Sequence, residues 1–384
     1  MSLAILDNAL DQVFDYGSIE NKCQFTFIDL FAGIGGFHQA AKSLGGDCVF
    51  ACDIDNNARV AYQYNYNIEP KADITTINEN EVPEHDMLFA GFPCQPFSII
   101  GNRLGFDDIR GTLFFDIVRI LKAKMPNTFV LENVKQLYSH NKGKTLKIII
   151  TTLKSIGYTV HCKVLNALDY GLPQKRERTI IVGFLEKVNF KFPTPIKQKP
   201  LDKILETNID KKHFASERIR EKRKSLHKSK YPVAIWHENK SGNISSYPYS
   251  CALRAGASYN YLLVNGERRL TPREMLRLQG FPDSFQIVCN DSQTRKQAGN
   301  AVPVPMIKSV LKEVINISFP RSCVGTIDSS ERDYAGQSGL LEVCRQWLVS
   351  YAFPRRSVGT IESPRDDIII EKKIITKANP NGVT

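Results

Sequence analysis

The chain has 384 residues, 42% of them hydrophobic, and a formal net charge of +11 at pH 7. This is enough apolar content for one large domain, or for one domain with a smaller one attached. The longest apolar run falls short of the roughly 18 residues of a membrane span, and the N-terminus is acidic where a signal peptide would be basic. The positive charge favours a polyanionic partner, nucleic acid first.

The nine cysteines are scattered along the chain in no paired spacing. Cys48 and Cys52 do not have the spacing of a zinc ribbon, and the sequence contains no second cysteine pair that could complete a zinc site with them. We therefore expect no metal site, no disulfide framework, and a reducing, cytoplasmic compartment.

Short apolar runs alternate with amphipathic stretches over residues 25–193. Strands are predicted at residues 25–33, 48–55, 86–92, 128–134, 158–167 and 178–185, and helices at residues 36–44, 56–65, 113–125 and 145–157. Such alternation predicts an α/β fold with a doubly wound, mostly parallel sheet. Ligands bind sheets of this kind at the carboxyl ends of the strands.

The composition changes after residue 193. Residues 194–230 hold twelve Lys and Arg against five Asp and Glu, and Gly, Ser and Tyr become frequent up to residue 265. Residues 194–265 therefore predict a small, irregular domain. A solvated surface helix is the other interpretation of the basic run.

Residues 266–318 return to the first domain, with helices predicted at residues 271–280 and 301–315. Thr271 is the expected N-cap of the first of these helices, followed by proline. Residues 1–24 and 319–384 are predicted to be terminal extensions. The second extension contains an imperfect repeat, "FPRSCVGTIDSSERD" and "FPRRSVGTIESPRDD".

A glycine turn joins the first predicted strand to the first helix in "DLFAGIGGFH", residues 29–38. Such a turn can cradle a phosphate or an amino-acid carboxylate at the start of the helix. Asp53 ends the second strand, where an acidic residue binds ribose hydroxyls, and Asp55 is the alternative. We expect Asp73 at the next strand end, able to accept from an adenine amino group. A nucleoside with an amino-acid tail describes S-adenosylmethionine, although each acid could also be a turn residue.

Two prolines flank Cys94 in "GFPCQPF", residues 91–97, and present its thiol stiffly after a strand. Glu132 and Asn133 end another strand, where a carboxyl group can act as an acid or a donor beside the thiol. Arg176 and Arg178 alternate into a further strand and so share a face. A buried structural cysteine and a basic edge strand are the alternative interpretations.

The motifs "DLFAGIGGF", "GFPCQPFS", "LENV", "QKRER" and "GNAVPVP" occur in this order. By them, residues 25–316 resemble the DNA (cytosine-5)-methyltransferases of bacterial restriction–modification systems. The resemblance implies the S-adenosylmethionine-dependent methyltransferase fold, with residues 194–265 recognising the target. It also implies double-stranded DNA as substrate, a monomer on DNA near the nucleoid, and a cognate restriction endonuclease that forms no stable complex with the chain.

The resemblance also implies roles for the motif residues. The Cys94 thiolate would add to carbon 6 of a flipped-out cytosine, so that carbon 5 can take the methyl group. Glu132 would protonate or hydrogen-bond ring N3, and Asn133 would support that geometry. Arg178 would steady O2 of the base, with help from Arg176.

The cofactor contacts that the resemblance implies come from five separate stretches of the chain. They are Phe31, Ala32, Gly33, Ile34, Gly35, Gly36, Asp53, Ile54, Asp73, Ile74, Phe92, Asn300 and Ala301. The family often has Glu at the position of Asp53, and some relatives have Ser at that of Ala301. The product would be S-adenosylhomocysteine.

The DNA contacts come from two segments. Ser98, Ile100, Arg103 and Arg110 belong to a loop that resembles the family's mobile loop over DNA, and Arg254 lies in the expected base-reading segment "CALRAGASYNY". Two alternatives are a tRNA cytosine-5 methyltransferase of the same fold and a non-catalytic DNA-binding relative. The first usually carries Cys-Phe-Thr after Glu-Asn-Val, which this chain lacks. The second is disfavoured because no proposed active-site residue is missing.

Overall fold

The computed structural model describes residues 25–93 and 113–319. Cys94, Ser98, Ile100, Arg103 and Arg110 lie outside the described residues, as do the first extension and the repeats of the second. In the part that is described, no helix is long and apolar enough to cross a membrane.

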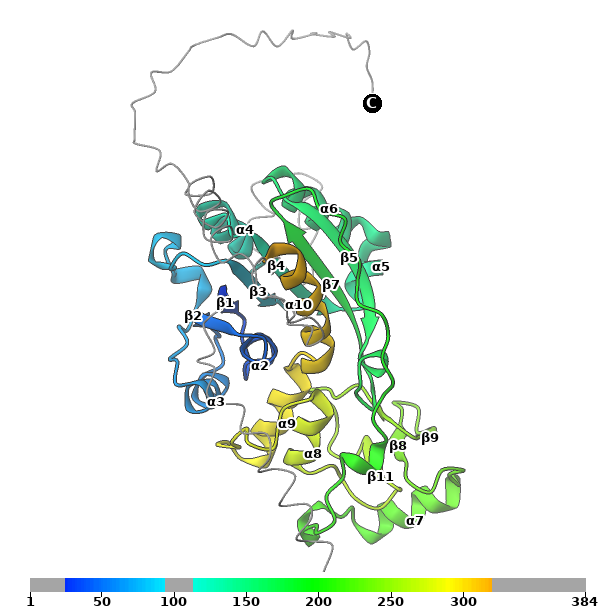
Figure 1. The fold of residues 1–384 in the computed structure, drawn as a ribbon. Coiled ribbons are helices and arrows are strands. Elements are labelled where there is room, and N and C mark those ends of the chain that lie inside the picture. Colours follow the sequence, from blue (N-terminus) through cyan, green and yellow to red (C-terminus); the bar gives the residue numbers. More distant parts are fainter. Residues whose placement is uncertain (1–24, 94–112, 320–384) are drawn as a thin grey trace, which may run out of the picture. The chain divides into compact units, whose positions relative to one another are not determined.

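A six-stranded sheet, in the order β2-β1-β3-β4-β7-β5, forms the centre of the fold (Figure 1). Its strands are β1 (Phe25–Leu30), β2 (Gly46–Cys52), β3 (Met87–Gly91), β4 (Thr128–Val134), β5 (Thr159–Asn166) and β7 (Glu177–Phe184). The pairs β1–β2, β1–β3 and β3–β4 are parallel, whereas β7 runs antiparallel to both β4 and β5. The predicted doubly wound, mostly parallel sheet is confirmed.

Successive residues along each strand point to opposite faces of the sheet and belong to two separate hydrophobic cores. Phe27, Met87 and Phe89 belong to the core on one face, and Ile28 and Leu88 to the core on the other. The first face is covered by α2 (Gly36–Lys42), α3 (Asn56–Tyr66) and α10 (Val304–Ser318); the second is covered by α4 (Leu113–Lys124) and α6 (Lys144–Ser155), with the short α5 (Gln136–Ser139) between β4 and α6. Both faces of the sheet are therefore buried, as parallel sheets require.

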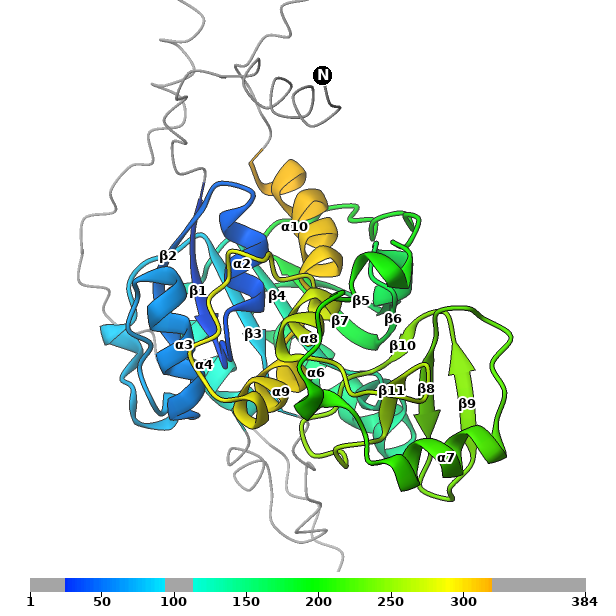
Figure 2. The same ribbon diagram turned by 90° about the horizontal axis from the view of Figure 1, so that it is seen from below.

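Residues 194–265 contain a second, smaller sheet. It has the antiparallel order β11-β8-β9, with β8 (Ile235–Glu238), β9 (Ile244–Tyr247) and β11 (Leu262–Val264), and α7 (Glu217–Leu226) beside it. Figure 2 places these elements on the side of the described fold away from β2 and α3. A parallel pair, β6 (Gln174–Lys175) with β10 (Ser250–Cys251), connects this region to the segment before β7.

The basic helix α7 is only partly a solvated surface helix. Arg223 is 1% exposed, and its guanidinium lies 2.7 Å from Oε2 of Glu238 on β8. The helix is therefore attached to the small sheet through one of its basic residues.

Glu274 connects the small sheet to α8 (Pro272–Gln279), which precedes α9 (Asp291–Asn300). Its carboxylate is fully buried and accepts two hydrogen bonds from Arg268, at 2.8 Å each. It also accepts from the backbone N–H of Thr271, whose hydroxyl accepts from the N–H of Glu274 in return. The predicted N-cap at Thr271 is confirmed, and it is part of a capping box.

Asp29 is the next-to-last residue of β1 and has no exposed surface. It shares this interior with His38 and Tyr62, whose Nδ1 and hydroxyl oxygen are 2.8 Å apart. Burial raises the pKa of Asp29 well above its usual range, and burial lowers the pKa of His38 to about 3. The interior is polar but favours uncharged side chains.

Glu274→Ala is expected to lower the free energy of unfolding by about 3–5 kcal/mol, because it leaves the buried Arg268 guanidinium without its carboxylate. Urea unfolding followed by circular dichroism measures the change. Glu221→Ala, at an exposed position on α7, is the control and should change it by less than about 0.5 kcal/mol. Equal effects of the two substitutions would contradict the role given to Glu274.

Asp29→Asn is expected to reduce the dependence of stability on pH. A carboxyl group whose pKa is raised by folding binds more protons in the native state, so its contribution to stability falls as pH rises above the unfolded value of about 4. Urea midpoints measured from pH 5 to pH 8 should fall less in this variant than in the wild type. The exposed Asp47→Asn is the control, and a variant with an unchanged pH dependence speaks against the assignment.

Candidate active site

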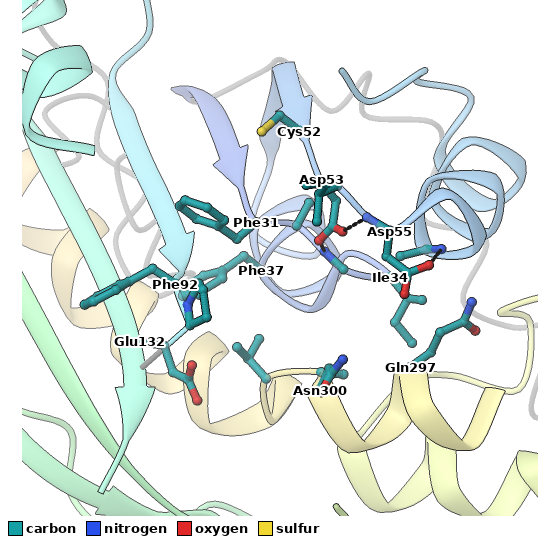
Figure 3. Close-up of a pocket in the computed structure, with 18 of the residues that line it drawn as sticks. Phe31, Ile34, Phe37, Cys52, Asp53, Asp55, Phe92, Glu132, Gln297 and Asn300 are labelled. Carbon is teal, nitrogen blue, oxygen red and sulfur yellow. Dashed lines mark hydrogen bonds between the residues drawn. The ribbon is translucent and has the colours of Figure 1, made fainter. Parts of the chain in front are cut away.

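The carboxyl ends of β1 to β4 and the turn between α9 and α10 surround a cavity of about 460 Å³ (Figure 3). Most of the predicted cofactor and catalytic residues that the structure describes line it: Phe31, Ala32, Gly33, Ile34, Asp53, Ile54, Asp73, Ile74, Phe92, Glu132, Arg176, Arg178, Asn300 and Ala301. Residues at the ends of five strands, β1, β2, β3, β4 and β7, thus meet residues from the end of α9 at one edge of the sheet.

The glycine turn forms one wall because β1 ends at Leu30 and the chain turns sharply. Phe31, Gly33 and Gly35 have φ angles of 55°, 57° and 82°. A Cβ atom on Gly33 would meet no atom within 4 Å, whereas one on Gly35 would lie 2.2 Å from the Tyr66 ring. Gly33 therefore borders open space, and Gly35 and Gly36 lie behind the cavity wall and allow close packing.

Asp53 holds the glycine turn against the end of β2. Its Oδ2 accepts from the N–H of Gly33 at 2.7 Å, and its Oδ1 accepts from the N–H of Asp55 at 2.8 Å. Burial raises the pKa of Asp53, although these backbone donors oppose that shift. Each oxygen retains a lone pair that can accept from a ligand.

Asp55 is engaged elsewhere. Its carboxylate caps α3 by accepting from the N–H groups of Asn57 and Ala58, and it lies 2.6 Å from Nζ of Lys296. The hydrogen bond from Lys296 lowers the pKa of Asp55. Of the two carboxylates considered from the sequence, Asp53 has the freer acceptor positions.

The prediction that Asp73 ends a strand is wrong. Between β2 and β3 the chain pairs with the sheet at the isolated bridge of Lys71 with Cys52, and Asp73 then caps the short 3-10 helix Ile74–Thr76. Its carboxylate accepts from the N–H and the hydroxyl of Thr75 at 2.9 and 2.8 Å, which lowers its pKa. Asp73 still reaches the cavity wall, although a turn and not a strand places it there.

Glu132 and Arg178 form an ion pair on the opposite wall. Nε of Arg178 lies 2.6 Å from Oε1 of Glu132, and the two side chains are 13% and 10% exposed. The antiparallel direction of β7 brings them together, because Val134, two residues beyond Glu132, pairs with Arg178. Side chains two positions apart on one strand share a face.

Asn133 fixes the backbone that leads to Cys94. Its Nδ2 donates to the carbonyl oxygen of Phe92 at 2.9 Å, and its Oδ1 accepts from the N–H of Val134. Pro93, the last described residue of this segment, borders the cavity. The side chain of Asn133 thus joins the end of β4 to the residues directly before the thiol.

Arg176 reaches the cavity wall but uses its guanidinium for the framework. It is 1% exposed and donates to the carbonyl oxygens of Leu253, Gly299 and Ala301 at 2.8–2.9 Å. Burial lowers its pKa to about 9. These bonds describe a positioning residue, whereas the sequence suggested that it would assist Arg178 on the base.

Lys296 and Gln297 also line the cavity. Neither residue is among the site residues predicted from the sequence. Lys296 pairs with Asp55, which is 241 residues away in the chain. No local pattern marks such a contact. The described residues contain no group of three or more His, Cys, Asp or Glu that could hold a metal ion.

Solved structures share this fold. A mutant of DNMT2 from Spodoptera frugiperda superposes with a TM-score of 0.61 at 21% identity, covering 76% of this chain and 99% of that one. A DNA modification methyltransferase encoded within an E. coli prophage gives a TM-score of 0.57 at 21% identity, with 76% and 98% covered.

Sequence relatives are much more similar. Type II methyltransferase M.NgoBI of Neisseria gonorrhoeae is 54% identical over 297 residues, and M.HaeII of Haemophilus aegyptius is 53% identical; each match covers 76% of this chain and 93% of the relative. The family model for C-5 cytosine-specific DNA methylases matches residues 25–316. The chain therefore belongs to the family of C-5 cytosine-specific DNA methylases and is a DNA (cytosine-5)-methyltransferase.

Proposed function

We propose that this cavity binds S-adenosylmethionine on its β1–β2 side and a flipped-out cytosine of double-stranded DNA on its β4–β7 side. The observation that carries the proposal is the division of the cavity between two kinds of wall. Glycine backbone, Asp53 and apolar side chains stand on one side, and the Glu132–Arg178 pair stands beside Pro93 on the other. A base must leave the duplex to reach such an enclosed pair.

The residues on the first side fit a nucleoside with an amino-acid tail. Asp53 keeps acceptor positions for ribose hydroxyls, and Ile54 beside it is 76% exposed, which offers an apolar surface to a purine ring. Gly33 leaves open space for an approaching amino-acid group. Asp73 is the acceptor for the adenine amino group. When bound, S-adenosylmethionine supplies a methyl group made electrophilic by the sulfonium.

The residues on the second side fit the chemistry of the base. The Cys94 thiolate adds to carbon 6 of cytosine, and the electron pair displaced toward carbon 5 makes that atom nucleophilic. Glu132 donates a proton or hydrogen bond to ring N3, and Arg178 donates to O2. After methyl transfer, loss of the carbon 5 proton expels the thiolate. Asn133 supports this geometry through the Phe92 carbonyl.

The biological setting we propose is protection of host DNA in a restriction–modification system. The similar proteins from Neisseria gonorrhoeae and Haemophilus aegyptius are named as Type II methyltransferases. A cognate endonuclease would recognise the same sequence independently, without a stable complex. We propose a monomer on DNA in the bacterial cytoplasm, with residues 194–265 reading the target.

Cys94→Ser is expected to lower the methylation rate by on the order of 10³-fold or more, because a hydroxyl is a far weaker nucleophile than a thiolate. Bisulfite sequencing of DNA from cells that express each variant identifies the base and its sequence context. Binding of S-adenosylmethionine, measured by calorimetry, should persist. Cys162→Ser, on β5 and outside the cavity wall, is the control. A Ser variant at a tenth of the wild-type rate would refute the assignment.

Asn133→Ala is expected to lower kcat by on the order of 100-fold, because a misplacement of about 1 Å at the thiol is enough for such a loss. The Kd for S-adenosylmethionine should change by less than about twofold. Single-turnover methylation of a duplex containing the mapped site measures the rate. An unchanged rate in a folded variant shows that the bond to Phe92 does not position the thiol.

A further inference from the structure

The segment from residue 252 to residue 261 is attached to the rest of the fold along its main chain. Leu253 donates its N–H to Oε1 of Gln174 at 3.1 Å, and its carbonyl oxygen accepts from Arg176 at 2.9 Å. Arg295 donates to the carbonyl oxygen of Ala257, and Arg223 donates to that of Asn260. Arginines from three distant parts of the chain thus fix a segment that has little secondary structure of its own.

Arg254 is an exposed residue of this segment, and it directly follows Leu253 in the chain. The adjoining Leu253 is bonded to Arg176, which lines the cavity. A Cβ atom on Gly299, another lining residue, would lie 2.5 Å from the N atom of Ala255 and 2.8 Å from the carbonyl carbon of Arg254. The absence of a side chain at Gly299 therefore allows the backbone of Arg254 to lie against the C-terminal end of α9.

The side chain of Arg254 is oriented by an aromatic ring. Its guanidinium carbon lies 4.8 Å from the ring centroid of Tyr261, which is 7% exposed. The hydroxyl of Tyr261 accepts from the N–H of Arg254 at 3.0 Å. Cation–π contact stabilises this arrangement and leaves the guanidinium edge available.

Within the described part of the chain, the guanidinium of Arg254 makes no hydrogen bond and no ion pair. Other arginines of the region, Arg176, Arg223 and Arg268, all donate to carbonyl or carboxylate oxygens. A stacked, oriented guanidinium with its donors free matches the O6 and N7 acceptors of guanine, which lie in one plane in the major groove. A phosphate contact needs the charge but not this orientation.

We propose that Arg254 reads a guanine of the recognition sequence by donating two hydrogen bonds to O6 and N7 of that base. This inference rests on the proposed function, since it assumes that DNA lies with the flipped cytosine at the cavity. Arg254 is then a specificity-determining residue. The main-chain hydrogen bonds of the segment hold Arg254 at a fixed position relative to Arg176 in the cavity wall.

The test begins with the recognition sequence of the wild type, mapped by bisulfite sequencing. Arg254→Gln and Arg254→Lys are then compared with the wild type on duplexes that carry each base substitution in turn. Arg218→Gln, at an exposed position on α7, is the matched control. Rates under kcat/KM conditions and the salt dependence of DNA binding are measured for every variant.

If Arg254 reads a guanine, Arg254→Gln lowers kcat/KM on the cognate duplex by about 5- to 140-fold and loses discrimination at one G·C pair. Arg254→Lys should lose discrimination at the same G·C pair as Arg254→Gln, because lysine lacks the planar guanidinium that donates two parallel hydrogen bonds. A uniform loss across all duplexes, restored by Lys and with a salt slope lower by about 1 in Gln, identifies a phosphate contact and overturns the proposal. Unchanged specificity in both variants also overturns it.

Different results would contradict the proposed function and the role of Arg254. A wild type that methylates no cytosine contradicts the proposed function. A wild type that methylates a defined sequence, together with Arg254 variants that keep its full specificity, contradicts only the role of Arg254.

Discussion

The buried guanidinium of Arg176 holds together three segments that the chain separates by up to 125 residues. An arginine provides five donors in a fixed plane, and here it meets backbone carbonyl groups at residues 253, 299 and 301. Removing the charged donor would leave these buried carbonyl groups unsatisfied, and such losses are large in a protein interior. Arg176, which directly precedes β7, thereby connects the end of α9 and the residue that follows it to the segment around Leu253.

The reversed direction of β7 is the second constraint on the active site. A parallel strand would place residues of its amino-terminal end at the far edge of the sheet. Because β7 is antiparallel to β4, the first residues of β7 lie beside the carboxyl end of β4. Arg178 therefore meets Glu132 there. The acid and the cation are therefore positioned by regular backbone pairing and not by a loop.

Local patterns in the sequence predict most of the sheet and its helices. Alternation such as that of Phe27 and Ile28, and the capping residues Thr271 and Glu274, act over a few residues and can be seen directly. Asp73 was misplaced because an acid before a short 3-10 turn looks like an acid after a strand. The three bonds of Arg176 end on carbonyl oxygens, which every residue carries, so no pattern could reveal them. The contact of Lys296 with Asp55 depends on tertiary packing in the same way.

The hydrogen bonds that attach residues 253–260 to other elements reach the main chain of that segment, while the buried side chain of Leu253 and the ring of Tyr259, on which Arg269 and Arg295 stack, add side-chain contacts. Gln174, Arg176, Arg223 and Arg295 bind the amide or carbonyl groups of Leu253, Ala257 and Asn260, which any residue other than proline can supply in full. Exposed side chains of this segment that make no stacking contact can therefore be exchanged while these main-chain hydrogen bonds stay intact. If this segment reads DNA as proposed, single substitutions in it can change the target sequence while the fold and the cavity wall that holds Glu132 and Arg178 stay the same.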